Sequence, residues 1–200
     1  MTLKLLGTII LIGIPTGITL GVIGGKFSTE LGVIIKGARF VTKVIPVLVL
    51  LFWLHYPLQG MLHVVINPFW TTVIALGLIN MIATASIISI ELQLIPKAYR
   101  EAGITLGMNS LQIVKYIELP LLLRRTLPQI LLGQASILEY TLFASLISVP
   151  ELFRVAQTIN AMAYKPIAIY SLLVIFFLLI LGPLHILINW IKEKYIAEYA

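Results

Sequence analysis

The chain alternates between long apolar runs and short polar segments over its 200 residues. A helix that crosses a bilayer core needs about 20 predominantly apolar residues, and most of the apolar runs reach that length. They predict five membrane-spanning helices, at 5–25, 44–58, 69–95, 125–149 and 166–190. The expected fold class is therefore all-α and integral to the membrane, with residues 1–200 forming one transmembrane domain.

Small residues and prolines within the spans predict how these helices pack. Pro46 stands near the start of the second span, where neighbouring helices can satisfy the carbonyl that it frees. Gly182 and Pro183 predict a bend in the fifth span. Glycines recur at roughly one-turn spacing in the first span, so a neighbouring helix can approach it closely at Gly7, Gly13, Gly17 and Gly21.

The polar segments predict the orientation of the chain in the membrane. Residues 26–43 are expected to form a polar connection that holds four Lys or Arg against Glu30 alone. The segment from Lys97 to Arg125 holds five basic residues, and the stretch after Trp190 holds two. Because cytoplasmic loops are enriched in Lys and Arg, all three segments are expected in the cytoplasm. The N-terminus is then outside and the C-terminus cytoplasmic, in the cell membrane, with 150–165 as an external re-entrant or surface segment.

Composition supports a membrane protein and excludes several other classes. The chain is 60% hydrophobic and only 11% charged, whereas soluble domains are about a quarter charged. The net charge of +6 does not indicate a nucleic-acid partner, because the basic residues are scattered between apolar spans. The sequence has no cysteine and no motif for phosphate binding, zinc proteolysis or a nucleophilic serine, so no catalytic site is expected.

Two histidines are the only residues that suggest a metal ligand set. His55 and His63 are eight residues apart, with Pro57 and Gly60 between them and no carboxylate nearby. Such a pair is more typical of interfacial loop residues than of metal ligands. No metal site is therefore expected.

The segment 97–120 is the one long polar interruption in the second half of the chain, and its pattern predicts two short helices. The first covers Ala98 to Gly107 and is ended by a glycine, the usual left-handed cap. Asn109, followed three residues later by Gln112, has the spacing of a capping box that opens the second helix. Pro120 is expected to end that second helix. Two helices within a cytoplasmic loop suggest a docking surface.

The same segment resembles a known family. Glu101-Ala102-Gly103, then Gly107, then Leu119-Pro120 match the EAA signature of the permease subunits of ABC importers, with Gly103 in place of the usual alanine. The resemblance implies a transport subunit that is not itself an enzyme, with a cytoplasmic coupling helix between spans 3 and 4. The residues that it assigns to coupling with the ATPase are Glu101, Ala102, Gly103, Gly107, Leu119 and Pro120.

A second resemblance points to the polar-amino-acid type of permease. Val149-Pro150-Glu151-Leu152 ahead of the last span is similar to the end of those permeases. The chain departs from them where they usually carry charges in the third and fourth spans. Here Ser86 and Ser89 stand in the third span, and Glu139 stands where a lysine is usual. The departures leave open an importer for another small solute, such as an osmolyte or an oxyanion, and a non-transporting scaffold subunit.

Three polar residues within the predicted spans are candidates for the substrate path: Glu139, Asn80 and Ser86. Ionisable groups at membrane depth are costly and by default mark a pathway or a pocket. Glu139 is expected near the bilayer middle, where its carboxylate could pair with a cationic substrate. A structural alternative has Glu139 hydrogen-bonded between helices, near Tyr140 or Gln134.

The resemblance also implies the partners. They are a second permease subunit as homo- or heterodimer, two cytoplasmic ATP-binding subunits, an external substrate-binding protein and the lipid bilayer. No cofactor is expected on this chain itself, because ATP and magnesium would be bound by the ATP-binding subunits. ATP-driven closure of those subunits would move the coupling helix and switch the spans between two states.

Overall fold

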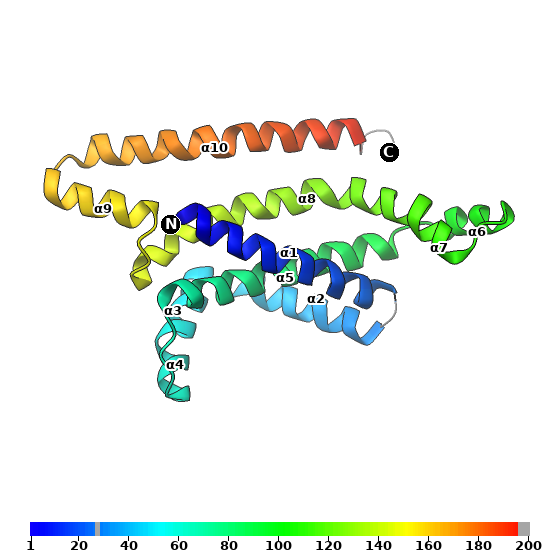
Figure 1. The fold of residues 1–200 in the computed structure, drawn as a ribbon, viewed down its shortest axis with the longest axis horizontal. Helices are drawn as coiled ribbons and strands as arrows, with labels where there is room; N and C mark the ends of the chain where they lie inside the picture. The colour runs from blue at the N-terminus through cyan, green and yellow to red at the C-terminus, as the bar shows by residue number, and fades with distance from the viewer. Residues whose placement is uncertain (27–28, 196–200) are drawn as a thin grey trace.

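The computed structural model describes residues 1–26 and 29–195, and all of its regular elements are helices. Figure 1 shows most of them lying along one common axis, with short helices at both ends. In chain order the elements are α1 (Thr2–Lys26), α2 (Thr29–Val44), α3 (Val47–His55), α4 (Pro57–Leu62), α5 (Pro68–Gln93), α6 (Lys97–Thr105), α7 (Ser110–Ile113), the π-helical turn η1 (Val114–Glu118), α8 (Leu119–Tyr140), the 3-10 helix η2 (Thr141–Ile147), α9 (Leu152–Ala163) and α10 (Pro166–Tyr195).

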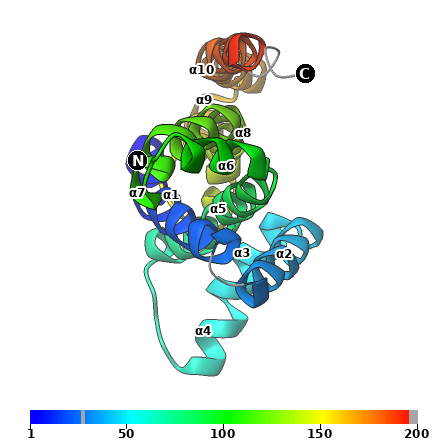
Figure 2. The same ribbon diagram turned by 90° about the vertical axis from the view of Figure 1, so that its right-hand side faces the viewer.

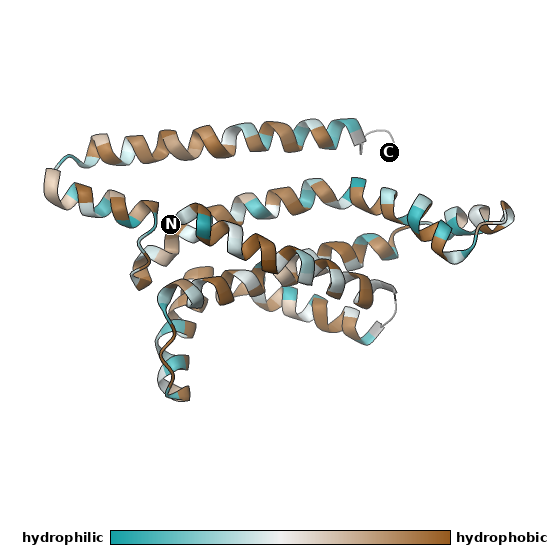
Figure 3. Cartoon of the chain, viewed as in Figure 1, coloured by the Kyte–Doolittle hydropathy of each residue, from teal (hydrophilic) through white to brown (hydrophobic). Residues whose placement is uncertain are grey.

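The expected membrane-spanning fold is confirmed. Four helical stretches are long and apolar enough to cross a membrane, namely 2–25, 68–93, 110–147 and 166–194. A bent pair of helices covering 30–62 makes a fifth candidate. Figure 3 shows apolar residues along the long helices and polar residues gathered at the far ends.

The interpretation of 26–43 as a polar connection is wrong. Residues 29–44 form α2, a helix of 16 residues that packs alongside α1 and α5 (Figure 2); residues 27 and 28 lie outside the described part. Its basic residues Lys36, Arg39 and Lys43 recur at i, i+3 and i+7, and thus share one face of the helix. The bent fifth candidate span therefore begins within the segment that was expected to be a loop.

Pro46 does more than bend the second span, because it separates two helices. The axes of the paired helices on either side of it differ by 95°. Pro46 has φ −58° and ψ 132°, an extended conformation, and proline cannot donate the hydrogen bond that would continue α2. After α3, the short helix α4 projects away from the bundle in both Figure 1 and Figure 2.

The expectation that Pro120 ends a helix is also wrong. Pro120 is the second residue of α8 and directly follows the π-helical turn η1, in which the Leu119 amide donates to the Val114 carbonyl. The turn η1 precedes it without a break, so residues 110–147 form one helical stretch of 38 residues. Arg124 and Arg125 consequently lie within α8 and do not mark its start.

The C-terminal part adds two helices to one side of the bundle. Residues 152–163, within the segment expected outside the membrane, form α9, and α10 continues as one helix through Pro183. Both views show α10 set apart from α1, α2 and α5. It contacts α8 and α9, and most of its apolar side chains are exposed, for example Ile167 and Leu172.

The closest helix pair in the bundle is α1 with α5. A Cβ placed on Gly17 would lie 2.7 Å from the carbonyl oxygen of Met81, and one on Gly21 would lie 2.7 Å from that of Ala85. These glycines therefore confirm the close approach expected in the first span, whereas Gly7 has no atom within 4 Å of its Cβ position. A cluster of buried side chains fills the end of the bundle where α1, α3, α5 and η2 meet, and it includes Leu5, Ile9, Leu51, Val73, Leu76 and Ile147.

Candidate functional site

A two-helix arm stands at the end of the molecule opposite α9 (Figure 1). It consists of α6, α7 and η1, and it joins the ends of α5 and α8. The predicted capping box is present, because Asn109 Oδ1 accepts a hydrogen bond from the Gln112 amide while Gln112 Oε1 accepts one from the Asn109 amide. The capping box fixes where the second helix of the arm begins.

Glycines at two positions let the arm fold back on itself. Gly103 is buried, and a Cβ there would lie 3.0 Å from Ile113 and 3.1 Å from Ile117. Gly107 has φ +76°, and its amide donates to the Ile104 carbonyl at 2.9 Å. The predicted left-handed cap is therefore present, and the glycine in the third position of the signature permits close helix packing.

The arm presents apolar side chains to its surroundings. Ile104, Leu106 and Leu111 are 60%, 80% and 75% exposed. Arg100 Nη1 lies 3.8 Å from Glu118 Oε1, which links α6 to η1. Large exposed side chains of this kind near the tip of a projecting element are typical of a contact with another protein.

The residues assigned to coupling fall into two groups in the structure. Glu101, Ala102 and Leu119 are exposed, so they are available to a partner. Gly103 and Gly107 instead shape the arm, as described above. Pro120 is half-buried at the junction with α8. Their role in coupling stays a prediction.

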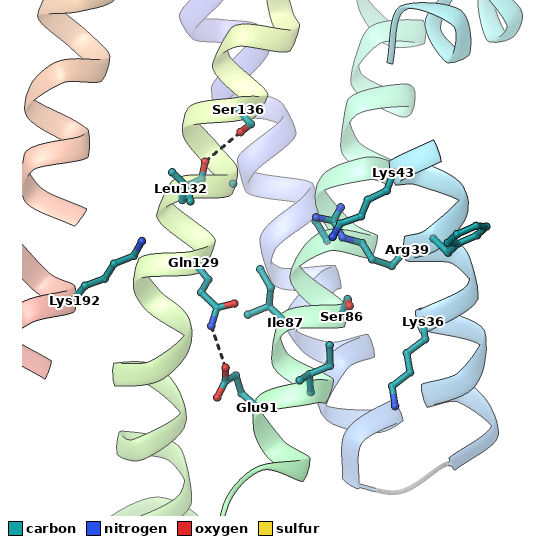
Figure 4. A pocket seen from close by; sticks show the side chains of 14 residues that line it. Lys36, Arg39, Lys43, Ser86, Ile87, Glu91, Gln129, Leu132, Ser136 and Lys192 are labelled. Carbon is teal, nitrogen blue, oxygen red and sulfur yellow. Dashed lines mark hydrogen bonds between the residues drawn. The ribbon is translucent and has the colours of Figure 1, made fainter. Parts of the chain in front are cut away.

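The second feature is a groove between α2 and α8, with α5 as its floor (Figure 4). It comprises two adjoining cavities with volumes of about 660 and 450 Å³. Both volumes fall within the range of about 300–1,000 Å³ that is usual for small-molecule sites. Five residues line both cavities: Arg39, Lys43, Ala83, Gly133 and Ser136.

The groove is rich in positive charge. Among the residues that the structure describes, four basic side chains line it and only one acid, Glu91. The Glu91 carboxylate accepts a hydrogen bond from Gln129 Nε2 at 3.0 Å. Within residues 1–26 and 29–195, no ion pair connects any of the four basic groups to a carboxylate; they are Lys36, Arg39, Lys43 and Lys192.

Of the three predicted path residues, Asn80 and Ser86 line the groove. Asn80 lies in the smaller cavity, where its side-chain amide pairs reciprocally with that of Gln134 at 3.0 and 2.9 Å. This pair joins α5 to α8. Ser86 is buried in the wall of the larger cavity. A share in the path stays a prediction for both residues.

Glu139 lies outside the lining of both cavities. Its side chain is exposed on α8 beside the lining residues Ser136 and Tyr140. Gln134, a hydrogen-bond partner expected for it, is paired with Asn80 instead. A path role for Glu139 remains a prediction that would require a surface formed with a second subunit.

Sequence reasoning missed the basic residues of α2 as site residues, because it placed them in a loop. Their i, i+3, i+7 spacing was the signal that could have found them, since it aligns three charges on one helical face. Gln129 was missed as well. It is one of six described lining residues of α8, at spacings that follow one helix face: Gln129, Leu132, Gly133, Ser136, Ile137 and Tyr140.

Two polar clusters hold the short helices α9 and α4. Glu151 caps α9, because its carboxylate oxygens accept hydrogen bonds from the amides of Phe153 at 2.9 Å and Arg154 at 2.7 Å. Burial raises the pKa of Glu151 above its ordinary value, although these hydrogen bonds act in the opposite direction. At the other cluster, Gln59 Nε2 donates to Thr71 Oγ1 at 3.0 Å and ties α4 to α5.

The histidines do not form a metal site in the described part of the chain, where no three potential ligands converge. His55 Nδ1 lies 3.3 Å from Thr71 Oγ1, within the cluster that holds α4. His63 is exposed at the end of α4. His55 thus ends α3 and is not a loop residue, and the absence of a metal site stays a prediction.

Comparison with known proteins gives a consistent picture. Residues 13–196 match the family model described as binding-protein-dependent transport system inner membrane component. The glutamine transport system permease protein GlnP of Escherichia coli K12 is 29% identical over 191 residues, which cover 92% of this chain and 86% of GlnP. The L-cystine transport system permease protein TcyB of Bacillus subtilis is 34% identical over 155 residues, which cover 77% of this chain and 65% of TcyB.

Solved structures show the same fold. A crystal structure of an amino acid ABC transporter with histidines superposes with a TM-score of 0.83 at 21% identity, covering 97% of this chain and 90% of that one. The inward-facing MetNI methionine ABC transporter gives a TM-score of 0.66 at 19% identity, covering 95% and 90%.

Proposed function

This chain belongs to the family of inner membrane components of binding-protein-dependent transport systems, and from that membership we propose that it carries amino acids along the groove between α2, α5 and α8. It is a multi-pass permease subunit of an ATP-driven ABC importer. The curated relatives GlnP and TcyB are named for glutamine and cystine, which supports an amino-acid substrate for this chain.

We also propose that the chain is coupled to ATP-binding subunits through the projecting arm formed by α6, α7 and η1. The arm bears the signature residues Glu101 and Ala102 on its surface and the exposed apolar residues Ile104, Leu106 and Leu111 near its tip. It connects directly to two long helices of the bundle, α5 and α8. An ATP-binding subunit that holds the arm could therefore move both helices together. ATP and magnesium would be bound by that subunit.

Pairing with a second permease subunit is part of the same proposal. The described part of one chain offers at most five spans, and the larger cavity is lined by α2, α5 and α8 with Lys192 alone from α10. A second copy or a sister permease would complete the path. The exposed Glu139 on α8 could then reach the path from the edge of the groove. An external substrate-binding protein would deliver the solute.

Charging the tip of the arm is expected to abolish docking. Leu106→Asp places a carboxylate where an exposed apolar side chain would become buried against the ATP-binding subunit, and an unpaired buried charge is strongly disfavoured. We expect the ATP-binding subunit to be lost from the purified complex while the permease remains in the membrane. Affinity purification followed by quantitative gel analysis measures this. Thr105→Asp, one residue away, is the control, and equal loss with both variants would contradict a specific role for Leu106.

The proposed orientation has an independent test in a chain without native cysteine. Ser110 lies in the arm, and Thr158 lies on α9; both side chains are exposed. We expect an impermeant thiol reagent added to intact cells to label a cysteine at 158 but to label one at 110 only after permeabilisation. Labelling of both positions in intact cells would overturn the model with the N-terminus outside.

A further inference from the structure

The charge of the groove carries an inference about which solutes pass. We infer that Arg39 and Lys43 select amino acids that carry a second carboxylate, that is, acidic amino acids. The inference rests on the proposed transport function. It concerns the sign of the charge on the substrate. An acidic substrate is the opposite of the cationic substrate that was expected to pair with Glu139.

The geometry places two cations at the centre of the groove. Arg39 and Lys43 are one turn apart on α2 and line both cavities. In Figure 4 their side chains extend from α2 into the space beside α5, where Ser86 and Ile87 are labelled. Arg39 is half-buried. The two groups can therefore contact one small molecule at the same time.

These cations lack a counterion in the described part of the chain. Glu91 is the only acid that residues 1–26 and 29–195 contribute to either lining, and one of its oxygens already accepts a hydrogen bond from Gln129. Glu139, the one acid of α8, lies outside both linings. An unpaired cation within an apolar bundle is costly, so the groove favours any ligand that supplies negative charge.

Counting charges ranks the classes of amino acid. The lining carries four basic groups against one acid. A basic amino acid adds a net positive charge to this set, a neutral one adds none, and an acidic one adds a negative charge. A neutral amino acid also offers a single carboxylate for two adjacent cations. An acidic amino acid offers one carboxylate to each, and charge-assisted hydrogen bonds to carboxylates are the stronger class.

The neutral polar groups of the groove can bind the part of the substrate that the two cations do not, the α-ammonium group. Ser136 and Tyr140 line the smaller cavity opposite Arg39 and can accept hydrogen bonds from the α-ammonium group. Asn80 lines the same cavity, but its side-chain amide is engaged with Gln134. The recognition of charge therefore falls to α2, and the recognition of the ammonium group falls to α8.

The test uses the permease complex purified with its ATP-binding subunits and without the external protein, so that the selectivity of that protein does not enter. Melting temperatures are measured in glutamate, glutamine or arginine at about 10 mM, because a ligand that binds only the folded state raises the midpoint. We expect a rise with glutamate and none with arginine. Arg39→Gln and Lys43→Gln should each remove the rise, Arg39→Lys should keep it, and Arg154→Gln, which removes an exposed cation outside the groove, should leave it unchanged.

Uptake into proteoliposomes with the complete importer gives the second readout. We expect each of Arg39→Gln and Lys43→Gln to lower glutamate uptake about tenfold, the effect of one charge-assisted contact, with a smaller change for glutamine. Equal losses for glutamate, glutamine and arginine, or a midpoint raised by arginine, would overturn the inference. If the unaltered importer carries glutamine or arginine but no glutamate, the inference is overturned too, although amino-acid import stands. Failure of the unaltered importer to carry any of the three would refute the proposed function itself.

Discussion

Replacing Gly107 with valine is expected to abolish substrate-stimulated ATP hydrolysis while membrane insertion continues. Gly107 has φ +76°, a left-handed conformation that costs a residue with a Cβ about 1–2 kcal/mol, and a β-branched residue more. The cost arises in the backbone, because no atom lies within 4 Å of the Cβ position. The turn that orients α6 against α7 would rearrange, and the apolar tip would no longer match its partner. ATPase activity of the reconstituted importer should fall to its unstimulated rate.

Asparagine at the same position is the matched control. Asparagine enters the left-handed region more readily than other residues with a Cβ, so Gly107→Asn should retain most of the coupled activity. Membrane abundance of both variants is measured by immunoblot. If Gly107→Val couples as well as Gly107→Asn, the geometry of this turn has no part in coupling.

Adding a single methyl group at Gly17 is expected to destabilise the protein, although the same change at Gly7, also in α1, should not. At Gly17 a Cβ would lie 2.7 Å from both the Met81 carbonyl oxygen and Thr84 Cβ, so α1 must move away from α5. Overpacking of this kind costs about 1–3 kcal/mol. Gly7 has open space around its Cβ position, and Gly→Ala in a helix otherwise stabilises by up to about 1 kcal/mol.

The two substitutions are therefore expected to shift thermal stability in opposite directions. Gly17→Ala should lower the melting temperature of the detergent-purified protein, and Gly7→Ala should leave it unchanged or raise it. Gly21→Ala repeats the first test one turn further along, since its Cβ would lie 2.7 Å from Ile88 Cβ. A stable Gly17→Ala protein would mean that the α1–α5 contact is not limiting for stability.

Local signals in the sequence predicted much of the arm and of the spans. The capping box of Asn109 and Gln112 and the left-handed cap at Gly107 depend on residues within one or two turns, and both are present. Runs of about 20 apolar residues locate the long helices because a membrane leaves backbone groups few alternatives to helical hydrogen bonds. Such features need no knowledge of neighbouring elements.

The errors arose where the surroundings of a residue decide its role. Lys36, Arg39 and Lys43 suggested a loop because charge is costly in a span, yet they line a groove that a helix places within the bundle. Pro120 suggested a helix end, but the chain stays helical through it, from the π-helical turn η1 into α8. The path role of Glu139 stays a prediction, because it rests on depth along the helix, and depth does not determine which helix face meets the groove.

The continuity of the helical stretch 110–147 has a mechanical consequence. At about 1.5 Å per residue, its 38 residues form a rod of about 57 Å that begins in the arm and ends at the buried cluster around Ile147. Pro120 does not break it, and η1 preserves its helical hydrogen bonding. A rod of this length that tilts by about 10° about one end moves its other end by about 10 Å. A small rotation of the arm by an ATP-driven partner would thus become a large displacement at the far end of the helix. The stiffness of this one helix determines how much of the rotation reaches that end.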